Sequence, residues 1–275
     1  MRVVTLNIWN KSGPWQQRMA LIRKQLQALD PDILGLQEVL ELETPSVTMN
    51  QADELRGVLA HRAYGAAHDL MPKPVEGQPK LRFGNAILSR WPIAHHEVFA
   101  LPGDDESDQR RCLLRAVIDA PFGTLNVFVT HLNWKLDEGF IREKQVKAIA
   151  RIIADKSPDD GRYPPILMGD MNAEPHSDEI RYLGGYTRLG DARGVRFSDA
   201  WDYATDRDHG FSFDGTRNPF AAQVHEHPRR IDYIFVRGPD EKGRGVPTNV
   251  RLCFDEPEGE VFPSDHFGVV AELSE

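Results

Sequence analysis

The stretch Pro165-Ile166-Leu167-Met168-Gly169-Asp170-Met171-Asn172 is an apolar run that ends in an acid and, two residues later, in an amide. A short uninterrupted apolar run of this kind is typical of a buried strand. Near the end of the chain, Ser264-Asp265-His266 directly precedes a second run, Phe267-Gly268-Val269-Val270. Both stretches place polar side chains at the end of a buried strand, where a rigid sheet can aim them into a cleft.

Further apolar runs predict a chain made mostly of strands. These runs lie at Val3–Ile8, Ile33–Leu36, Asn85–Leu88, Leu113–Ile118, Leu125–Val129, Ile166–Met168, Ile231–Val236 and Val269–Leu273. Apolar residues at helical spacing predict amphipathic helices over 14–29 and 137–154. Many strands with few helices indicate an α/β fold of two packed sheets flanked by helices.

No change of composition divides the chain, so residues 1–275 are expected to form a single domain. Segments 71–79, 102–109 and 184–230 are rich in glycine, proline and charge, and we expect surface loops that form a rim around a site. Within the last of them, the run 211–220 is a candidate lid. Nothing in the sequence indicates an oligomeric state.

The composition limits the classes of function. The two cysteines, Cys112 and Cys253, form no disulfide framework, which suits a reducing compartment. No apolar run approaches the roughly 20 residues of a membrane span, and no signal peptide precedes the first strand, so a cytoplasmic location is expected. The net charge of −9 argues against a binder of duplex DNA, which usually carries a basic face. It favours a small or lipid-like phosphoester and a site that holds a cation.

Polar residues recur where the predicted strands end. A polar group at the end of an apolar strand is costly unless it meets a partner. Each residue alone has a simple structural explanation as a turn, a helix cap or a solvated acid, but the whole set in this order favours one shared site. In chain order the positions are Asn7, Gln37-Glu38, Thr130-His131-Leu132, Asp170 with Asn172, Asp232, and Asp265-His266.

This joint pattern resembles the endonuclease/exonuclease/phosphatase (DNase-I-like) superfamily, and the resemblance extends over nearly the whole chain, from Val3 to Leu273. The resemblance implies a four-layer α/β/β/α sandwich of two mixed sheets flanked by helices. It also implies metal-assisted attack of water on a phosphoester. The motifs that carry it are Thr5-Leu6-Asn7, Gln37-Glu38, Gly84–Ser89, Thr130-His131-Leu132, Gly169-Asp170-Met171-Asn172, Ile231-Asp232-Tyr233 and Ser264-Asp265-His266.

The resemblance also implies a metal site. Glu38 would be the main ligand of Mg²⁺ or Mn²⁺, with Asn7 and Asp265 in its first or second coordination sphere. This agrees with the chemistry of Mg²⁺, which is commonly bound through one or two carboxylates together with water and substrate oxygens.

Catalytic roles follow from the same resemblance. Asp170 would orient or deprotonate the attacking water, and Asn172 would hold that water or a phosphate oxygen. His131 and His266 would donate hydrogen bonds to the phosphate, and Asp232 would fix the tautomer of His266. The sequence leaves open whether Asp170 or His266 is the general base.

Three functions remain possible for such a site. The first is a metal-dependent phosphoesterase acting on a small or lipid-like substrate. The second is a nuclease, either an endonuclease or an exonuclease, on DNA or RNA. The third is a catalytically silent scaffold, which would be expected to lack some motif residue, although all are present. Subfamily features favour none decisively: abasic-site endonucleases place a tyrosine at the position of His131, and Arg229–Phe235 lacks the inositol 5-phosphatase signature.

Other residues are secondary candidates. Trp134 follows His131 closely and is the best candidate for an aromatic contact with substrate, whereas Trp201 is expected to pack in the core. His225 and His227 are better explained as part of a solvated loop than as metal ligands. Three arginines are candidates for phosphate contact, of which the last lies inside a predicted strand and is expected to be structural: Arg110, Arg111 and Arg115.

Overall fold

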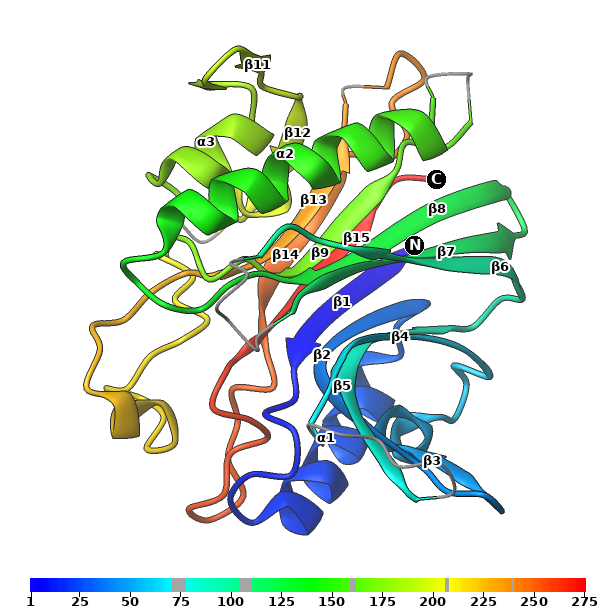
Figure 1. Ribbon diagram of the computed structural model, residues 1–275, viewed down its shortest axis with the longest axis vertical. Helices are drawn as coiled ribbons and strands as arrows, with labels where there is room; N and C mark the ends of the chain where they lie inside the picture. Colours follow the sequence, from blue (N-terminus) through cyan, green and yellow to red (C-terminus); the bar gives the residue numbers. More distant parts are fainter. Residues whose placement is uncertain (71–77, 104–109, 159–161, 206–207, 239) are drawn as a thin grey trace.

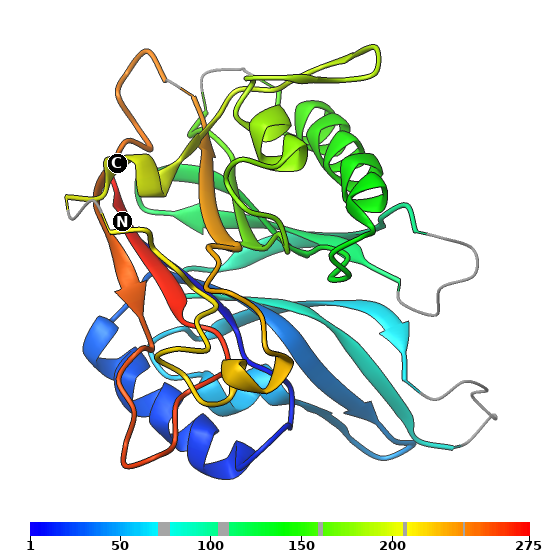
Figure 2. The same cartoon turned by 90° about the vertical axis from the view of Figure 1, so that its left-hand side faces the viewer.

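The computed structural model describes residues 1–70, 78–103, 110–158, 162–205, 208–238 and 240–275 (Figure 1). Its centre is a pair of mixed sheets that pack face to face, with seven strands in one sheet and six in the other. Helices cover the outer face of each sheet, as the two views show (Figures 1 and 2). The four-layer α/β/β/α sandwich expected from the sequence is therefore confirmed.

The first sheet has the strand order β14-β15-β1-β2-β5-β4, and β3 pairs with β2 beside this path. Only β1 and β2 run parallel, and the other pairs are antiparallel. The strands are β1 (Arg2–Asn7), β2 (Ile33–Glu43), β3 (Thr48–Asn50), β4 (His61–Asp69), β5 (Lys80–Ser89), β14 (Pro247–Cys253) and β15 (Gly268–Leu273).

The second sheet has the order β12-β13-β9-β8-β7-β6, in which only β8 and β9 are parallel. Its strands are β6 (Ile93–Ala100), β7 (Cys112–Ala120), β8 (Gly123–His131), β9 (Ile166–Asp170), β12 (Phe197–Asp199) and β13 (Asp232–Arg237). A separate two-stranded hairpin is formed by β10 (Arg188–Leu189) and β11 (Ala192–Arg193).

The helices complete the outer layers. Helix α1 (Trp15–Leu29) packs on the first sheet, and helices α2 (Gly139–Lys156) and α3 (Asp178–Leu183) pack on the second. Short 3₁₀ turns occur at η1 (Gln51–Leu55), η2 (Ala200–Tyr203) and η3 (Ala221–Val224). No helix in the described ranges is long and apolar enough to cross a membrane.

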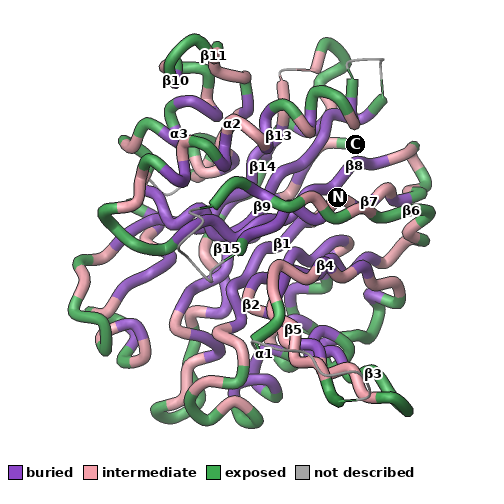
Figure 3. Tube along the Cα trace, in the orientation of Figure 1, coloured by how far each residue is buried: buried purple, intermediate pink, exposed green. Residues whose placement is uncertain are grey.

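Alternation along the strands builds three apolar layers, and buried residues fill the centre of the molecule (Figure 3). In β1, Val3 faces the second sheet while Val4 packs with residues of α1. The two sheets approach closely at Gly35, where an added Cβ would lie 2.6 Å from the sulfur of Met168. Cys112 and Cys253 are free and buried, and burial raises the pKa of Cys112 to about 12, so both are unreactive thiols.

Several elements were not predicted. Strands β4, β6 and β14 lie at sheet edges, where polar residues protect an unpaired rim and interrupt the apolar pattern. Helix α3 is too short for a clear helical period. Segment 184–230 was expected to be loop but contains short strands and 3₁₀ turns. The other two expected loops fall largely outside the described residues, at 71–77 and 104–109.

Candidate functional site

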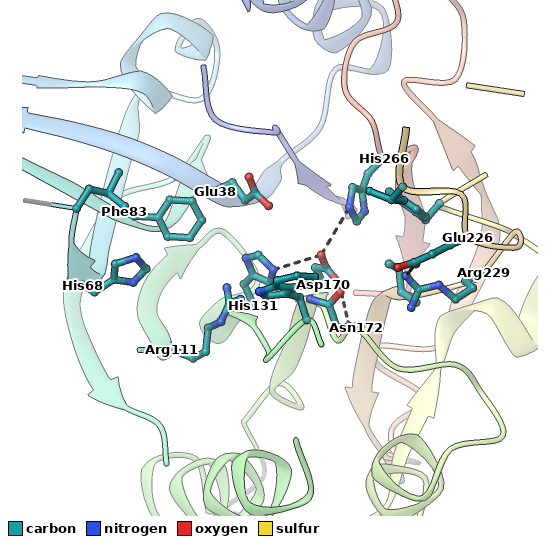
Figure 4. Close-up of a pocket in the computed structure, with 15 residues that line it drawn as sticks. Glu38, His68, Phe83, Arg111, His131, Asp170, Asn172, Glu226, Arg229 and His266 are labelled. Atoms are coloured by element: carbon teal, nitrogen blue, oxygen red, sulfur yellow. Dashed lines mark hydrogen bonds and ion pairs between the residues drawn. The ribbon is translucent and has the colours of Figure 1, made fainter. Parts of the chain in front are cut away.

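A cavity of about 380 Å³ opens where the two sheets meet, and motif residues from several strands line it (Figure 4). Its volume is in the range typical of small-molecule sites. In the view of Figure 4, Asp170, His131 and Asn172 form the centre, and Glu38 and His266 lie above them.

Strand register explains why distant residues meet here. Strands β8, β9 and β13 are neighbours, and Asp170 is paired in register with His131 on one side and with Asp232 on the other. Their side chains therefore point to the same face at one edge of the sheet. Both predicted strands ended two residues too early, at Val129 and Met168, and the ladder continues through the motif residues.

Asp170 is the centre of the site and is almost fully buried. Its Oδ2 accepts a hydrogen bond from Asn7 Nδ2 at 3.1 Å, and its Oδ1 accepts one from the Asn172 backbone N–H at 2.9 Å. The same Oδ2 lies 3.5 Å from His131 Nε2 and 3.8 Å from His266 Nε2. Burial, reinforced by the charge of Asp232, raises the pKa of Asp170 to about 7.

His266 is held by Asp232, whose Oδ2 lies 2.9 Å from His266 Nδ1. This contact directs Nε2 toward Asp170, as a carboxylate–histidine pair generally does. Burial alone would lower the pKa of His266, but the carboxylates of Asp232, Asp170 and Asp265 outweigh it and raise the pKa to about 10. The imidazole is therefore a hydrogen-bond donor at neutral pH. The Oγ of Ser212 accepts from the backbone N–H of Asp232 and helps to fix that strand.

Glu38 lies at a bulge of β2, between the registers of Leu36 and Val39. Its backbone has φ of 60°, a conformation that non-glycine residues seldom adopt and that is frequent at functional sites. The bulge turns its carboxylate toward the cavity, where Oε1 accepts from Asn7 Nδ2 at 3.2 Å and Oε2 accepts from Asn10 Nδ2 at 2.8 Å.

Asp265 and Asn172 complete the set of predicted residues. Burial raises the pKa of Asp265 to about 6, and the charge of Glu38 adds to this effect. Ser264 Oγ donates to Asp265 Oδ1 at 3.2 Å. Asn172 has φ of 48°, donates from Nδ2 to the Leu132 carbonyl at 3.2 Å, and lines the cavity. The structure thus gathers all eight predicted residues around one centre.

Arg111 lines the cavity. The sequence identified it only as one of three arginines that were candidates for contact with phosphate. It is 5% exposed, and no described residue forms a hydrogen bond or ion pair with its guanidinium. Burial lowers its pKa, and the charges of Glu38 and Asp170 oppose that shift. A buried cation without a partner is costly, so this group is expected to meet an anion in the cavity.

The contacts of Arg18 were not predicted, because the spacing of apolar residues indicates only that Arg18 lies in helix α1. Its guanidinium is fully buried and donates to the backbone carbonyls of Ile8, Trp9, Asn10, Ser12 and Pro263. It therefore fixes the loop after β1 against the segment that carries Asp265. The charges of Asp265 and Glu38 oppose the burial that lowers its pKa to about 10.

The structure separates the secondary candidates that line the cavity from those that lie elsewhere. Trp134 lines the cavity and is 49% exposed, whereas Trp201 packs against the core between the sheets. Arg115 bonds to Glu97 and Asn126 and is structural. His225 and His227 do not form a pair: His227 contacts Glu174 at 3.2 Å, and His225 follows η3.

The predicted lid at 211–220 is wrong. Ser212 and Asn218 are fully buried, and Asn218 Nδ2 donates to the Ser264 carbonyl at 2.8 Å. Phe213 pairs with Arg229 through backbone hydrogen bonds and packs its ring 5.0 Å from that of His266. The glycine and proline content suggested a mobile loop, but the buried polar anchors make this segment a fixed wall of the cavity.

Residues 4–266 match the model of the Endonuclease/Exonuclease/phosphatase family. The chain belongs to that family. Its members are in general metal-dependent hydrolases of phosphoesters. No curated protein matches the chain in sequence.

Solved structures of the same family share the fold. An endonuclease/exonuclease/phosphatase protein from Beutenbergia cavernae is 24% identical with a TM-score of 0.68, and the match covers 100% of this chain and 71% of that one. D. rerio TDP2 complexed with a single-strand DNA product is 18% identical with a TM-score of 0.74, covering 100% and 99%. Truncated TDP2 from Caenorhabditis elegans is 21% identical with a TM-score of 0.70, covering 100% and 97%.

The family's requirement for a divalent metal can be tested against the donors present. Glu38 and Asp265 offer hard carboxylate oxygens, and the charge of Glu38 acts to raise the pKa of Asp265, so the two acids lie near each other. Ligand atoms of Asp170, Asp232 and His266 also lie within 4.8 Å of one another. That second cluster includes a histidine nitrogen, whereas Glu38 and Asp265 offer only oxygen ligands, so the donor set around Glu38 fits a hard cation better.

Proposed function

We propose that this chain is a divalent-metal-dependent phosphoesterase that hydrolyses a small or lipid-like phosphate ester by attack of an activated water. The observation that carries the proposal is the position of Asp170. Its carboxylate lies between the Nε2 atoms of two histidines, and Glu38 lines the same cavity, with its charge acting on the nearby carboxyl of Asp265. A base, donors for phosphate oxygens and hard metal ligands therefore surround one small space.

Asp170 is proposed as the group that orients the water and accepts its proton. It is the acceptor on which Asn7, Asn172 and the two histidines converge, and backbone and amide donors fix both of its oxygens. His266 is the poorer base, since three carboxylates favour its protonated form. His131 and His266 would donate to the phosphate oxygens as negative charge accumulates on them.

Asp232 is proposed as a positioning residue. Its bond to Nδ1 of His266 sets the tautomer and the direction of Nε2. Asn172 would hold the attacking water or a non-bridging phosphate oxygen, because its side chain reaches the cavity from a fixed, left-handed backbone.

Glu38, Asn7 and Asp265 are proposed to hold Mg²⁺ or Mn²⁺. A divalent cation bound by such oxygens supplies charge that polarises the phosphoryl group and stabilises the leaving oxyanion. Arg111 is proposed as a contact to a non-bridging phosphate oxygen, which would give its buried guanidinium the anionic partner that no described residue provides.

The small or lipid-like substrate is supported by the lining of the cavity. No lysine of the described residues lines it, and its second arginine, Arg229, is already paired with Glu226. Apolar side chains that are roughly half exposed surround the polar centre: Leu70, Trp134 and Val224. Such a rim favours an ester with apolar groups over the backbone of a long polyanion.

A nuclease is the alternative function, favoured by the similarity to D. rerio TDP2, which was solved with a single-strand DNA product. The lack of lysines among the described residues that line the cavity and the net charge of −9 argue against it. A silent scaffold is the weakest possibility, since Glu38, Asp170, Asn172 and His266 are all present and converge.

A substrate panel tests the proposal. The panel contains bis-p-nitrophenyl phosphate, p-nitrophenyl phosphate, a phosphocholine diester, single-stranded DNA and short RNA, each with Mg²⁺, Mn²⁺, Ca²⁺ or EDTA. The proposal expects metal-dependent cleavage of a small ester and slower cleavage of nucleic acid. Preferential cleavage of DNA or RNA would favour the nuclease, and hydrolysis that persists in EDTA would contradict the metal requirement.

A further inference from the structure

Two apolar walls face each other across the catalytic centre. In Figure 4, His68 and Phe83 lie on one side of Asp170, and Glu226 and Arg229 lie on the opposite side. The first pair belongs to a larger, mostly apolar surface, and the second pair lies beside such a surface. The arrangement leaves the polar centre between two surfaces on which organic groups can rest.

The first wall consists of His68, Leu70 and Phe83, from the adjacent strands β4 and β5 and the residue after β4. The rings of His68 and Phe83 are in contact, with centroids 5.2 Å apart and planes tilted by 32°. His68 Nδ1 contacts the Arg110 carbonyl at 3.1 Å, and the Leu70 backbone N–H donates to the Leu81 carbonyl at 2.8 Å. The wall is therefore held by the sheet, yet Leu70 is 44% exposed.

The second wall consists of Phe213, Val224 and Ile231. Phe213 and Ile231 are buried together in a small cluster with Ala221, the first residue of η3. The guanidinium of Arg229 lies over the Phe213 ring at 5.6 Å and pairs with Glu226, and both charged residues line the cavity beside this wall. Val224, at the end of η3, is 54% exposed and lines the cavity.

Exposed apolar surface beside a catalytic centre is retained at a cost that substrate binding can offset. A phosphate monoester carries one organic group and would cover only one wall. A phosphodiester carries two, and both would be covered when its phosphorus lies at the centre. The two sides of the cavity come from different parts of the chain, so each can bind its own group.

We infer that the substrate of this site is a phosphodiester whose two organic groups are apolar or aromatic, one on each wall. This inference rests on the proposed phosphoesterase function. In the reaction, the water oxygen forms a bond to phosphorus and the bond from phosphorus to one ester oxygen breaks. The departing alcohol or phenol takes up a proton, and the product is a monoester that keeps the group on the other wall.

Three esters with the same leaving group test the inference: bis-p-nitrophenyl phosphate, methyl p-nitrophenyl phosphate and p-nitrophenyl phosphate. They differ only in the group that stays on phosphorus, which is an aryl ring, a methyl group or none. Because that group also changes intrinsic reactivity, the informative quantity is the ratio of kcat/KM for the bis-aryl ester to that for the methyl ester, compared between variants.

Leu70→Ala and Val224→Ala probe the two walls, and Val58→Ala is the matched control, since Val58 is also 54% exposed but does not line the cavity. Truncation of the wall that binds the retained group should lower this ratio by about three- to tenfold, because only the aryl ester loses apolar contact there. Truncation of the other wall should lower kcat/KM for both esters by a similar factor. Val58→Ala should change neither quantity.

The outcomes separate the inference from the proposed function. Metal-dependent hydrolysis that is unaffected by both wall variants would overturn the inference and leave the phosphoesterase intact. A kcat/KM for p-nitrophenyl phosphate above that for both diesters would also overturn the inference and leave the phosphoesterase function intact. No metal-dependent hydrolysis of any ester would overturn the proposed function and the inference together.

Discussion

We expect Arg111 to increase catalytic activity while it lowers the stability of the fold. A hydrogen bond to a charged group contributes about 1.5–3 kcal/mol, so Arg111→Met should lower kcat/KM on a phosphodiester by roughly 10- to 100-fold. The same change removes a buried cation that no described residue pairs, so the melting temperature should stay the same or rise. Thermal unfolding and initial rates measure the two effects.

The matched control at this scale is Arg115→Met. Arg115 bonds to Glu97, Asn126 and the Lys156 carbonyl, outside the cavity. This variant should lower the melting temperature and leave kcat/KM nearly unchanged. A destabilised Arg111→Met variant with full activity would show that Arg111 is structural.

The sequence marks a candidate site residue where a polar side chain interrupts an apolar strand. Asp170, Asp232 and His131 are such residues, and strand register brings them together. Arg111 and Phe83 give no comparable signal, because an arginine before a strand or a phenylalanine within one is ordinary. Their place in the cavity depends on how the sheets face each other, which a local pattern does not encode.

Strand β9 reaches the site only because Gly169 allows a close approach to β8. Its φ is 142°, and a Cβ at this position would lie 2.0 Å from the Thr130 carbonyl oxygen. Gly169→Ala should therefore force β8 and β9 apart and lower the free energy of unfolding by about 2 kcal/mol or more. Denaturant unfolding measures the effect.

Gly123→Ala separates the clash from the backbone strain. Gly123 has a similar φ of 132°, but an added Cβ would meet nothing within 4 Å. Gly123→Ala should lower the free energy of unfolding only by the strain of its backbone dihedral angle, and it should retain activity. Equal losses of stability in the two variants would contradict the role given to the contact with Thr130.

At the level of elements, the central strands and the two long helices followed from apolar periodicity, while the edge strands did not. Strand β6 shows the reason: most of its side chains are exposed or half buried, and it includes His95, His96 and Glu97. Solvent exposure removes the pattern on which a strand prediction depends. Pairing with β7 creates this strand, and that information is not local.

We propose that the whole chain, residues 1–275, folds as one domain. The central core contains residues of both sheets, including Val3 and Ile33 from one and Val127 and Met168 from the other. Neither sheet can bury its inner face without the other, so unfolding should be a single cooperative transition. Urea unfolding followed by tryptophan fluorescence and by far-ultraviolet circular dichroism should give coincident curves, and two separated transitions would contradict the proposal.

The dependence of hydrolysis on a metal held by Glu38 can be measured by titrating bis-p-nitrophenyl phosphate hydrolysis with Mn²⁺ or Mg²⁺. The variants to compare are Glu38→Gln and a control, Glu54→Gln, which alters an exposed acid of η1. We expect EDTA to abolish wild-type hydrolysis. Glu38→Gln should raise the metal concentration for half-maximal activity by at least about tenfold, and Glu54→Gln should match the wild type. An unchanged metal requirement in Glu38→Gln would contradict the account.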